Sequence, residues 1–357
     1  MKNFDEKIKE VNTFIKANKN LQDKNILKSV FAITHLKDAY FFNPFKKKNL
    51  SQTEFSGLSD KQLSDMFSDE RFVKLPKDKS EILFQELYNR TITNNGSKPR
   101  YFAALESMDP NIMGFIENTA NTIHINSTVI DRASETFSSY DAINKYNAGT
   151  HMFLTMVHET RHNIQNDKVI DFVLNENQTD EEKAMNAINL MYLTLDDYFA
   201  EQNDKSYFRR LNMDYQELFY EHDANYFSLK NFMDNNEVKS KHVASALRNY
   251  IENSIYLPER IYTSKDRDDV KQTKKDVEKR VQKMSDCVAS YLEDFKEHIA
   301  DCPLKKQVVD AVSDFIKTDD KNNSKFKTKV GSEINYMIDI ARNCKAVTDR
   351  EEEAYTM

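Results

Sequence analysis

Tryptophan is absent from this chain of 357 residues, and glycine and proline are scarce, with five and six copies. Because these two residues punctuate turns, their scarcity disfavours a fold made of many short strands joined by tight turns. The charged fraction of 31% beside 39% hydrophobic residues is typical of a mainly helical protein. We therefore expect the functional side chains to lie on helices more than on loops.

Cysteine is also rare, and it is confined to the last fifth of the chain. The chain has three cysteines, an odd number, and no two of them have C-x-x-C spacing: Cys287, Cys302 and Cys344. This pattern disfavours a framework of disulfides. The sequence predicts three reduced cysteines in the core.

An excess of positive charge and long apolar runs are missing too. The formal net charge of -7 disfavours binding to nucleic acid or to anionic membranes, because phosphate groups need clustered Lys and Arg, and the short run "FKKKN" (45–49) does not reverse this. No segment approaches the roughly 18 to 20 apolar residues of a membrane span, and the opening "MKNFDEKIKEV" has no apolar stretch of signal-peptide length. We expect a cytoplasmic protein without nucleic-acid or membrane partners, and the many Lys, Asn and Asp residues suggest a bacterial or phage origin.

Hydrophobic spacing divides the chain into three regions. Residues 1–92 form an N-terminal helical region, 93–235 a central core, and 236–357 a charged C-terminal helical region. The helical regions are possible surfaces for a protein partner. Two helix starts carry capping boxes, Ser59 with Gln62 and Thr179 with Glu182.

Short β-prone runs open the central region, at 100–105, 112–117 and 122–126. They predict a small antiparallel sheet that ends in a hairpin, with 122–126 as an edge strand and His124 facing solvent or a cleft. The fold class expected is α+β, mainly α.

The segment "MVHETRHNIQ" (156–165) places His158 and His162 four residues apart, with Glu159 directly after the first. On a helix, residues four apart lie on one face, so both imidazoles can reach one Zn²⁺. This is the H-E-x-x-H arrangement, in which the glutamate takes a proton from the metal-bound water. Residues 147–150 offer N-cap positions for this helix, which places His151 in its first turn. We expect Arg161 to form a salt bridge. Gln165 is a candidate to orient substrate.

A catalytic zinc needs a third protein ligand and an open position for water. The helical segment "ELFYEHDANYFSL" (217–229) offers Glu221, with Glu217, His222 and Asp223 as competitors. Small residues one and two turns after Glu221 permit a close approach to the histidine helix. Asn225 is a candidate to accept the other ring N–H of a ligand histidine.

These motifs resemble gluzincin metallopeptidases of the compact H-E-x-x-H type, including the ImmA/IrrE-like proteins. The residues that match are "HETRH" (158–162) and "EHDANYFS" (221–228), the latter similar to the third-ligand motif E-x-x-A-N-x-F-A of that group. The run "GFIENTANTIHIN" (114–126) also looks like the edge strand that holds an extended substrate. The resemblance implies a zincin-like core between helical regions, zinc bound by His158, His162 and Glu221, and Glu159 as general base and acid.

The function expected is that of a zinc endopeptidase acting on a protein or peptide substrate. Tyr220, Tyr226 and His222 are candidate donors to the oxyanion that forms during amide hydrolysis. The alternative is an inactive zincin-like binding or scaffold protein with a structural metal, which is typically held by four protein ligands.

Overall fold

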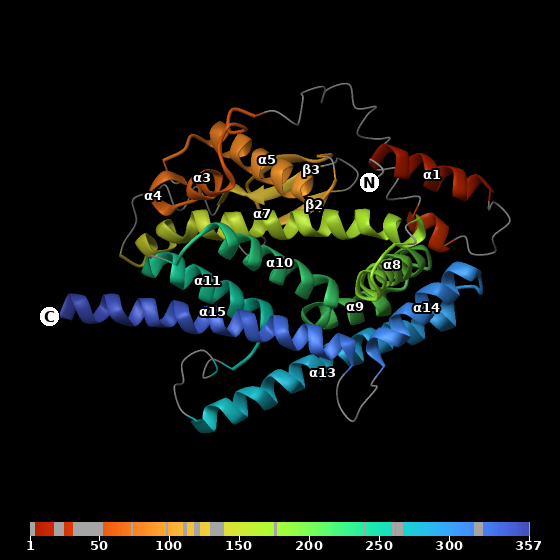
Figure 1. Cartoon of the computed structure of the whole chain (residues 1–357). Coiled ribbons are helices and arrows are strands. Elements are labelled where there is room, and N and C mark those ends of the chain that lie inside the picture. Colours follow the sequence, from red (N-terminus) through yellow and green to blue (C-terminus); the bar gives the residue numbers. More distant parts are fainter. Residues whose placement is uncertain are drawn as a thin grey trace. The chain divides into compact units, whose positions relative to one another are not determined.

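Helices dominate the computed structural model, with one small sheet, so the predicted fold class, α+β and mainly α, is confirmed (Figure 1). The structure describes residues 4–17, 25–30, 53–72, 74–97, 99–109, 113–117, 122–128, 139–174, 177–238, 240–258, 261, 267–317 and 324–356. Its helices are α1 (Phe4–Ala17), α3 (Asp60–Asp65), α4 (Asp69–Phe72), α5 (Lys77–Asn94), α7 (Ser139–Leu174), α8 (Asp180–Glu201), α9 (Lys205–Asp214), the 3₁₀ helix η1 (Tyr215–Glu217), α10 (Phe219–Asn235), α11 (Lys241–Ile255), α13 (Arg267–His298), α14 (Pro303–Ile316) and α15 (Lys325–Thr356). The strands are β1 (Phe102–Glu106), β2 (Gly114–Glu117) and β3 (Thr122–Asn126).

Both predicted capping boxes are present. The Ser59 side chain accepts the N–H of Gln62, and the Gln62 side chain accepts the N–H of Ser59. Thr179 and Glu182 make the same reciprocal pair at the start of α8. None of the helices traced in the ranges above is both long enough and apolar enough to cross a membrane.

The chain forms two compact units, each assembled from separated segments. The first unit contains Met1–Asp38, His162–His222 and Lys274–Glu333, and the second contains Ala39–Arg161, Asp223–Thr273 and Ile334–Met357. Segments from each of the three predicted regions therefore contribute to both units. The division passes through α7 and α10, the helices that carry the predicted metal ligands.

Aromatic rings fill much of the core of the second unit. Phe67 stacks on Phe72 with ring centroids 5.5 Å apart, and its edge meets Phe153 of α7 at 5.4 Å. Phe153 in turn meets Phe232 of α10 at 5.4 Å. Edge-to-face pairs of this kind stabilise a core beyond the area that they bury, and they hold α7 and α10 together within this unit.

The sheet belongs to the second unit and lies, with α5, on one side of α7 (Figure 1). Its strand order is β1-β3-β2, with β3 parallel to β1 and antiparallel to β2. The antiparallel pairing of 114–117 with 122–126 confirms two arms of the predicted hairpin, whose turn lies outside the described residues. The prediction of an antiparallel sheet with 122–126 at its edge is wrong, because β1 joins β3 in parallel and makes β3 the central strand.

Side chains of α5 cover the outer edge of β1. Gln85 Oε1 accepts the N–H of Ala103 at 2.9 Å, and Glu81 Oε1 accepts the N–H of Leu105 at 3.0 Å. The backbone donors that another strand would use are therefore already bonded. Among the described strands, β2 is left as the edge to which a further strand can add.

Helix α7 begins at Ser139, earlier than the sequence predicted. Residues 147–150, predicted as its start, lie inside the helix. Gly149 has a tertiary role there: a Cβ at this position would lie 2.0 Å from the carbonyl oxygen of Phe67. The glycine permits a close approach of two segments and does not mark a helix end.

The first unit packs α8 against α14, and aromatic rings join α8 to α13 and α9. Tyr192 of α8 meets Tyr291 of α13 with centroids 5.1 Å apart, and Phe199 stacks on Tyr207 of α9 at 3.8 Å. The residues described between 25 and 30 join this unit through Ser29, which donates to Asp197 at 2.8 Å.

The three cysteines are free, as predicted, and two of them are buried. Burial raises the pKa of both Cys287 and Cys344 to about 12, so neither is a reactive thiolate. Cys302 departs from the prediction because it is partly exposed and caps α14, its Sγ accepting the N–H of Lys305 at 3.2 Å.

Candidate metal centre

Two of the predicted ligands face each other from α7 and α10. His162 Nε2 lies 3.3 Å from Glu221 Oε1, and the two side chains are 9% and 10% exposed. Both residues belong to the first unit. Their heteroatoms are as far apart as two ligands of one tetrahedral zinc, for which bonds of about 2.0–2.1 Å give a separation of about 3.4 Å.

His158 lies one helical turn before His162 on the continuous helix α7, so α7 alone sets the relative position of the two histidines. One ligand atom from each of His158, His162 and Glu221 lies within 4.8 Å of the other two. Two imidazoles and a carboxylate are the donor set of many catalytic zinc sites. The residue types present therefore fit a zinc ion.

The competing ligands bind elsewhere. Glu217 pairs with Arg280 of α13, and His222 Nε2 lies 3.1 Å from Glu333 Oε2 of α15. Asp223 accepts two bonds from Arg161, at 2.7 and 3.1 Å. The alternatives left open by the sequence thus have partners far along the chain, and Glu221 is the acidic side chain that meets the histidines.

A fourth protein ligand is not found at this centre. In the ranges that the structure describes, the group of His, Cys, Asp and Glu side chains close enough to share an ion contains three members. His158 is partly exposed while the other two are buried. A tetrahedral ion held by these three side chains would have one further coordination position.

No family model, curated protein or solved structure matches this chain. The resemblance to gluzincins therefore depends on residues 158–162 and 221–228 and on the geometry that joins them.

The partner of the His162 ring is Gln165 and not Asn225. Gln165 Oε1 lies 2.8 Å from His162 Nδ1, and its Nε2 donates to the carbonyl oxygen of Tyr220 at 2.9 Å. The Asn225 side chain instead accepts a bond from the Tyr250 hydroxyl at 3.0 Å. The i,i+3 spacing of His162 and Gln165 on one helix was the signal that identifies this contact.

Glu159, the predicted general base, is buried on α7 directly after His158, with 9% of its surface exposed. Arg161 makes the salt bridge that the sequence favoured, and its guanidinium also lies 4.7 Å from the centroid of the Phe227 ring. The consecutive residues Arg161 and His162 of α7 thus contact different residues of α10, Asp223 and Glu221.

The three candidate oxyanion donors differ in their surroundings. Tyr220 stacks on the His162 ring, with centroids 4.3 Å apart and planes 9° apart. Tyr226 meets Tyr336 of α15 at 5.7 Å, and His222 bonds Glu333 as described above. Tyr220 is therefore in contact with the ring of a predicted ligand.

His124 is buried, which corrects the prediction that it faces solvent or a cleft. Its ring nitrogens lie 3.1 Å from Glu106 of β1 and 3.0 Å from Glu117 of β2, and Phe115 stacks on the ring at 4.6 Å. Because β3 is central, this histidine bridges both neighbouring strands. These contacts link its side chain to both neighbouring strands.

Strand β2 lies directly against the histidine helix. A Cβ on Gly114 would meet the carbonyl oxygen of His124 at 2.9 Å and Thr155 Cγ2 at 3.0 Å. Thr155 is three residues before His158, or about one turn along α7. The glycine therefore places the open sheet edge one turn from the first predicted ligand.

His151 lies within α7 and not in its first turn, since the helix begins twelve residues earlier, at Ser139. Burial lowers its pKa to about 4, so the imidazole is neutral at neutral pH. It is not a member of the group that could hold an ion.

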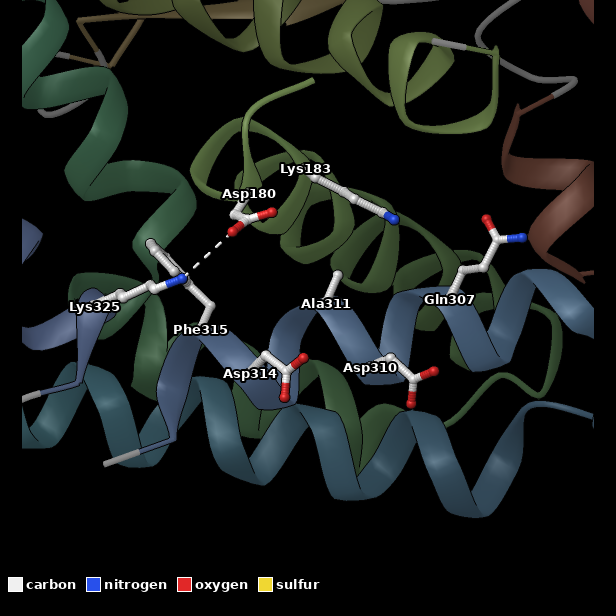
Figure 2. A pocket seen from close by; sticks show the side chains of 8 residues that line it. All are labelled: Asp180, Lys183, Gln307, Asp310, Ala311, Asp314, Phe315 and Lys325. Atoms are coloured by element: carbon white, nitrogen blue, oxygen red, sulfur yellow. Dashed lines mark ion pairs between the residues drawn. The ribbon is translucent and has the colours of Figure 1, made fainter. Parts of the chain in front are cut away.

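The first unit also contains a pocket of about 250 Å³ between α8 and α14 (Figure 2). Its rim carries both signs of charge, and Asp180 pairs with Lys325 across it at 3.6 Å. No histidine or cysteine lines it. The pocket therefore lacks the donor set found on α7 and α10.

Proposed function

We propose that this protein is a zinc-dependent endopeptidase that hydrolyses a peptide bond in a protein substrate. The observation that carries the proposal is the convergence of His158, His162 and Glu221 with no fourth protein ligand among the described residues. Structural zinc is usually enclosed by four protein ligands, whereas catalytic zinc keeps a position open. Three ligands and a partly exposed histidine favour the catalytic type.

The chain's own residues divide the chemistry among themselves. A bound Zn²⁺ would polarise the substrate carbonyl and lower the pKa of water to about 7. Glu159 would accept the proton of the attacking water and deliver it to the leaving amine. Tyr220 is the candidate donor to the developing oxyanion, because its ring lies against that of His162.

Strand β2 is the proposed contact for the substrate backbone. Because Asn126 donates to the Met113 carbonyl oxygen at 2.9 Å, alternation along the antiparallel ladder directs the backbone groups of Gly114 and Ile116 away from β3. An extended peptide can add there as a further strand. This replaces the strand at 122–126 that the sequence suggested for that purpose.

Zinc content and proteolysis of the Glu159→Gln variant test the proposal. We expect about one zinc per chain by elemental analysis in the wild type and in Glu159→Gln, because Glu159 is not a ligand. Cleavage of a fluorescence-quenched peptide library should be present in the wild type and absent in the variant and after chelation. Glu252→Gln, which alters an ion pair with Arg248 on α11, is the matched control and should cleave normally.

The outcomes separate the proposal from a zincin-like scaffold with a structural metal. A wild-type protein that binds zinc and cleaves no peptide of the library, with Glu159→Gln indistinguishable from it, supports the scaffold. A protein that binds no zinc refutes both.

A further inference from the structure

The side chain of Gln165 connects a predicted ligand on α7 to the backbone beside another ligand on α10. It is 1% exposed, and both ends of its amide are bonded. One end meets His162 Nδ1 at 2.8 Å, and the other donates to the Tyr220 carbonyl oxygen at 2.9 Å. Tyr220 directly precedes Glu221, and all four residues belong to the first unit.

The bond to Tyr220 determines the orientation of the amide. A carbonyl oxygen only accepts, so the Gln165 group facing Tyr220 has to be its NH₂. The group facing His162 is then the amide oxygen, which also only accepts. It follows that the hydrogen of neutral His162 resides on Nδ1, which leaves the Nε2 lone pair directed toward Glu221, 3.3 Å away.

We propose that Gln165 is a positioning residue for the metal centre: it holds His162 in the tautomer that presents Nε2 and fixes the spacing between His162 and Glu221. The proposal depends on the zinc site of the proposed function and adds a residue to it. A ligand histidine usually donates its second N–H to a neighbouring acceptor, and removal of that acceptor typically weakens metal binding 10- to 100-fold.

Two further features support this role. The Tyr220 ring lies nearly parallel to the His162 ring at 4.3 Å. The imidazole is therefore contacted on its face by Tyr220 and at its edge by Gln165. The amide is uncharged, so it fixes the tautomer without favouring the imidazolium form, which cannot bind metal. A carboxylate at this position would stabilise that competing form.

The first measurement is the tautomer of His162 in the wild-type protein, by two-dimensional ¹⁵N–¹H NMR of the imidazole. In the zinc-loaded protein we expect Nδ1 to carry the hydrogen and Nε2 to be the metal-bound nitrogen. A zinc-loaded protein in which Nδ1 binds the metal and Nε2 carries the hydrogen overturns the proposal without any substitution.

The second measurement is the zinc Kd of Gln165→Met, by competition with a fluorescent chelator. We expect binding 10- to 100-fold weaker than in the wild type and loss of the single tautomer in the NMR spectrum. Gln165→Glu keeps an acceptor for Nδ1 but cannot donate to Tyr220. It should retain the Nδ1–H tautomer in its neutral form and bind zinc with affinity between those of the wild type and Gln165→Met.

Gln85→Met is the matched control. Gln85 also bridges two groups, accepting from the Ala103 N–H and donating to the Tyr101 carbonyl oxygen, but it supports β1 in the second unit. It should lower stability and leave the zinc Kd unchanged. An unchanged Kd in Gln165→Met, with zinc bound normally by the wild type, overturns this proposal alone, whereas a wild type that binds no zinc overturns the proposed function.

Discussion

The ion pair between Arg161 and Asp223 separates structural from metal-binding roles beside the proposed centre. Its two bonds, at 2.7 and 3.1 Å, have the bidentate geometry that makes Arg–carboxylate pairs strong. The side chains are only 15% and 7% exposed. We predict that Asp223→Ala destabilises the fold and leaves the zinc stoichiometry unchanged.

The magnitude follows from what the substitution leaves behind. Removal of one partner of a buried pair costs about 3–5 kcal/mol, because the other charge stays buried and unpaired. Arg161 retains some contact with water, and Phe227 lies 4.7 Å from its guanidinium, which is worth about 0.5–1 kcal/mol. We therefore expect a loss of about 3 kcal/mol in the free energy of unfolding.

Urea denaturation and zinc titration of the same samples provide the assay. The unfolding free energy should fall by about 3 kcal/mol, while saturating zinc still gives one ion per chain with a Kd within about ten-fold of wild type. Arg161→Met combined with Asp223→Ala should cost much less than the sum of the two single substitutions, because neither charge is then left unpaired.

The opposite pattern would refute the reasoning. If Asp223→Ala released the zinc and left the unfolding free energy within about 0.5 kcal/mol of wild type, Asp223 would be a ligand. The metal would then have four protein ligands, and the scaffold interpretation would hold.

Three further substitutions, in α7 and α15, test other features of the fold. The lowered pKa of His151, about 4, means that the unfolded chain takes up a proton below pH 6.5 before the folded one does. The free energy of unfolding therefore falls as the pH drops from about 6.5 to 4, by about 2 kcal/mol at pH 5. His151→Gln should remove this loss, which urea titrations at pH 7.5 and pH 5 would measure. Gly149→Ala should lower the free energy of unfolding by more than about 3 kcal/mol, because its Cβ would overlap the Phe67 carbonyl. Gly331→Ala in α15 has its nearest contact at 3.8 Å, so it should instead stabilise the protein by about 0.5–1 kcal/mol and raise the melting temperature.

The features that the sequence predicted correctly are local ones. A capping box is a bond between residues three apart, so Ser59 with Gln62 and Thr179 with Glu182 could be recognised without knowledge of the rest of the chain. The facing of His158 and His162 follows in the same way from the period of one helix.

The sheet shows where local information ends. Strand β3 became central because β1, more than fifteen residues before it, pairs with it in parallel, and a run of alternating residues does not encode its neighbours. Likewise, no pattern within 102–106 reveals that Gln85 and Glu81 of α5 bond its outer edge. The start of α7 was wrong for a related reason, because Gly149 serves a contact with Phe67 that only the folded chain makes.

The third ligand was ambiguous in the sequence because Glu217, Glu221, His222 and Asp223 carry suitable atoms within seven positions. In the structure, three of them pair with distant residues: Glu217 with Arg280 of α13, His222 with Glu333 of α15, and Asp223 with Arg161 of α7. Each of these partners is more than sixty residues away in sequence, so the spacing of the four candidates could not exclude any of them. Only the family resemblance favoured Glu221.

The different contacts made by neighbouring residues of α7 and α10 bear on whether a metal bound there would be structural or catalytic. Arg161 and Asp223 join α7 to α10 with a buried bidentate pair, and the adjacent His162 meets Glu221 across the same two helices. A structural zinc is needed where a fold has no other means of joining its segments, as in small domains whose core is insufficient. Here Phe153 and Phe232 also join α7 to α10 through the core. Because these contacts already hold the helices together without an ion, they support the proposal that an ion bound by the three side chains would act on a substrate.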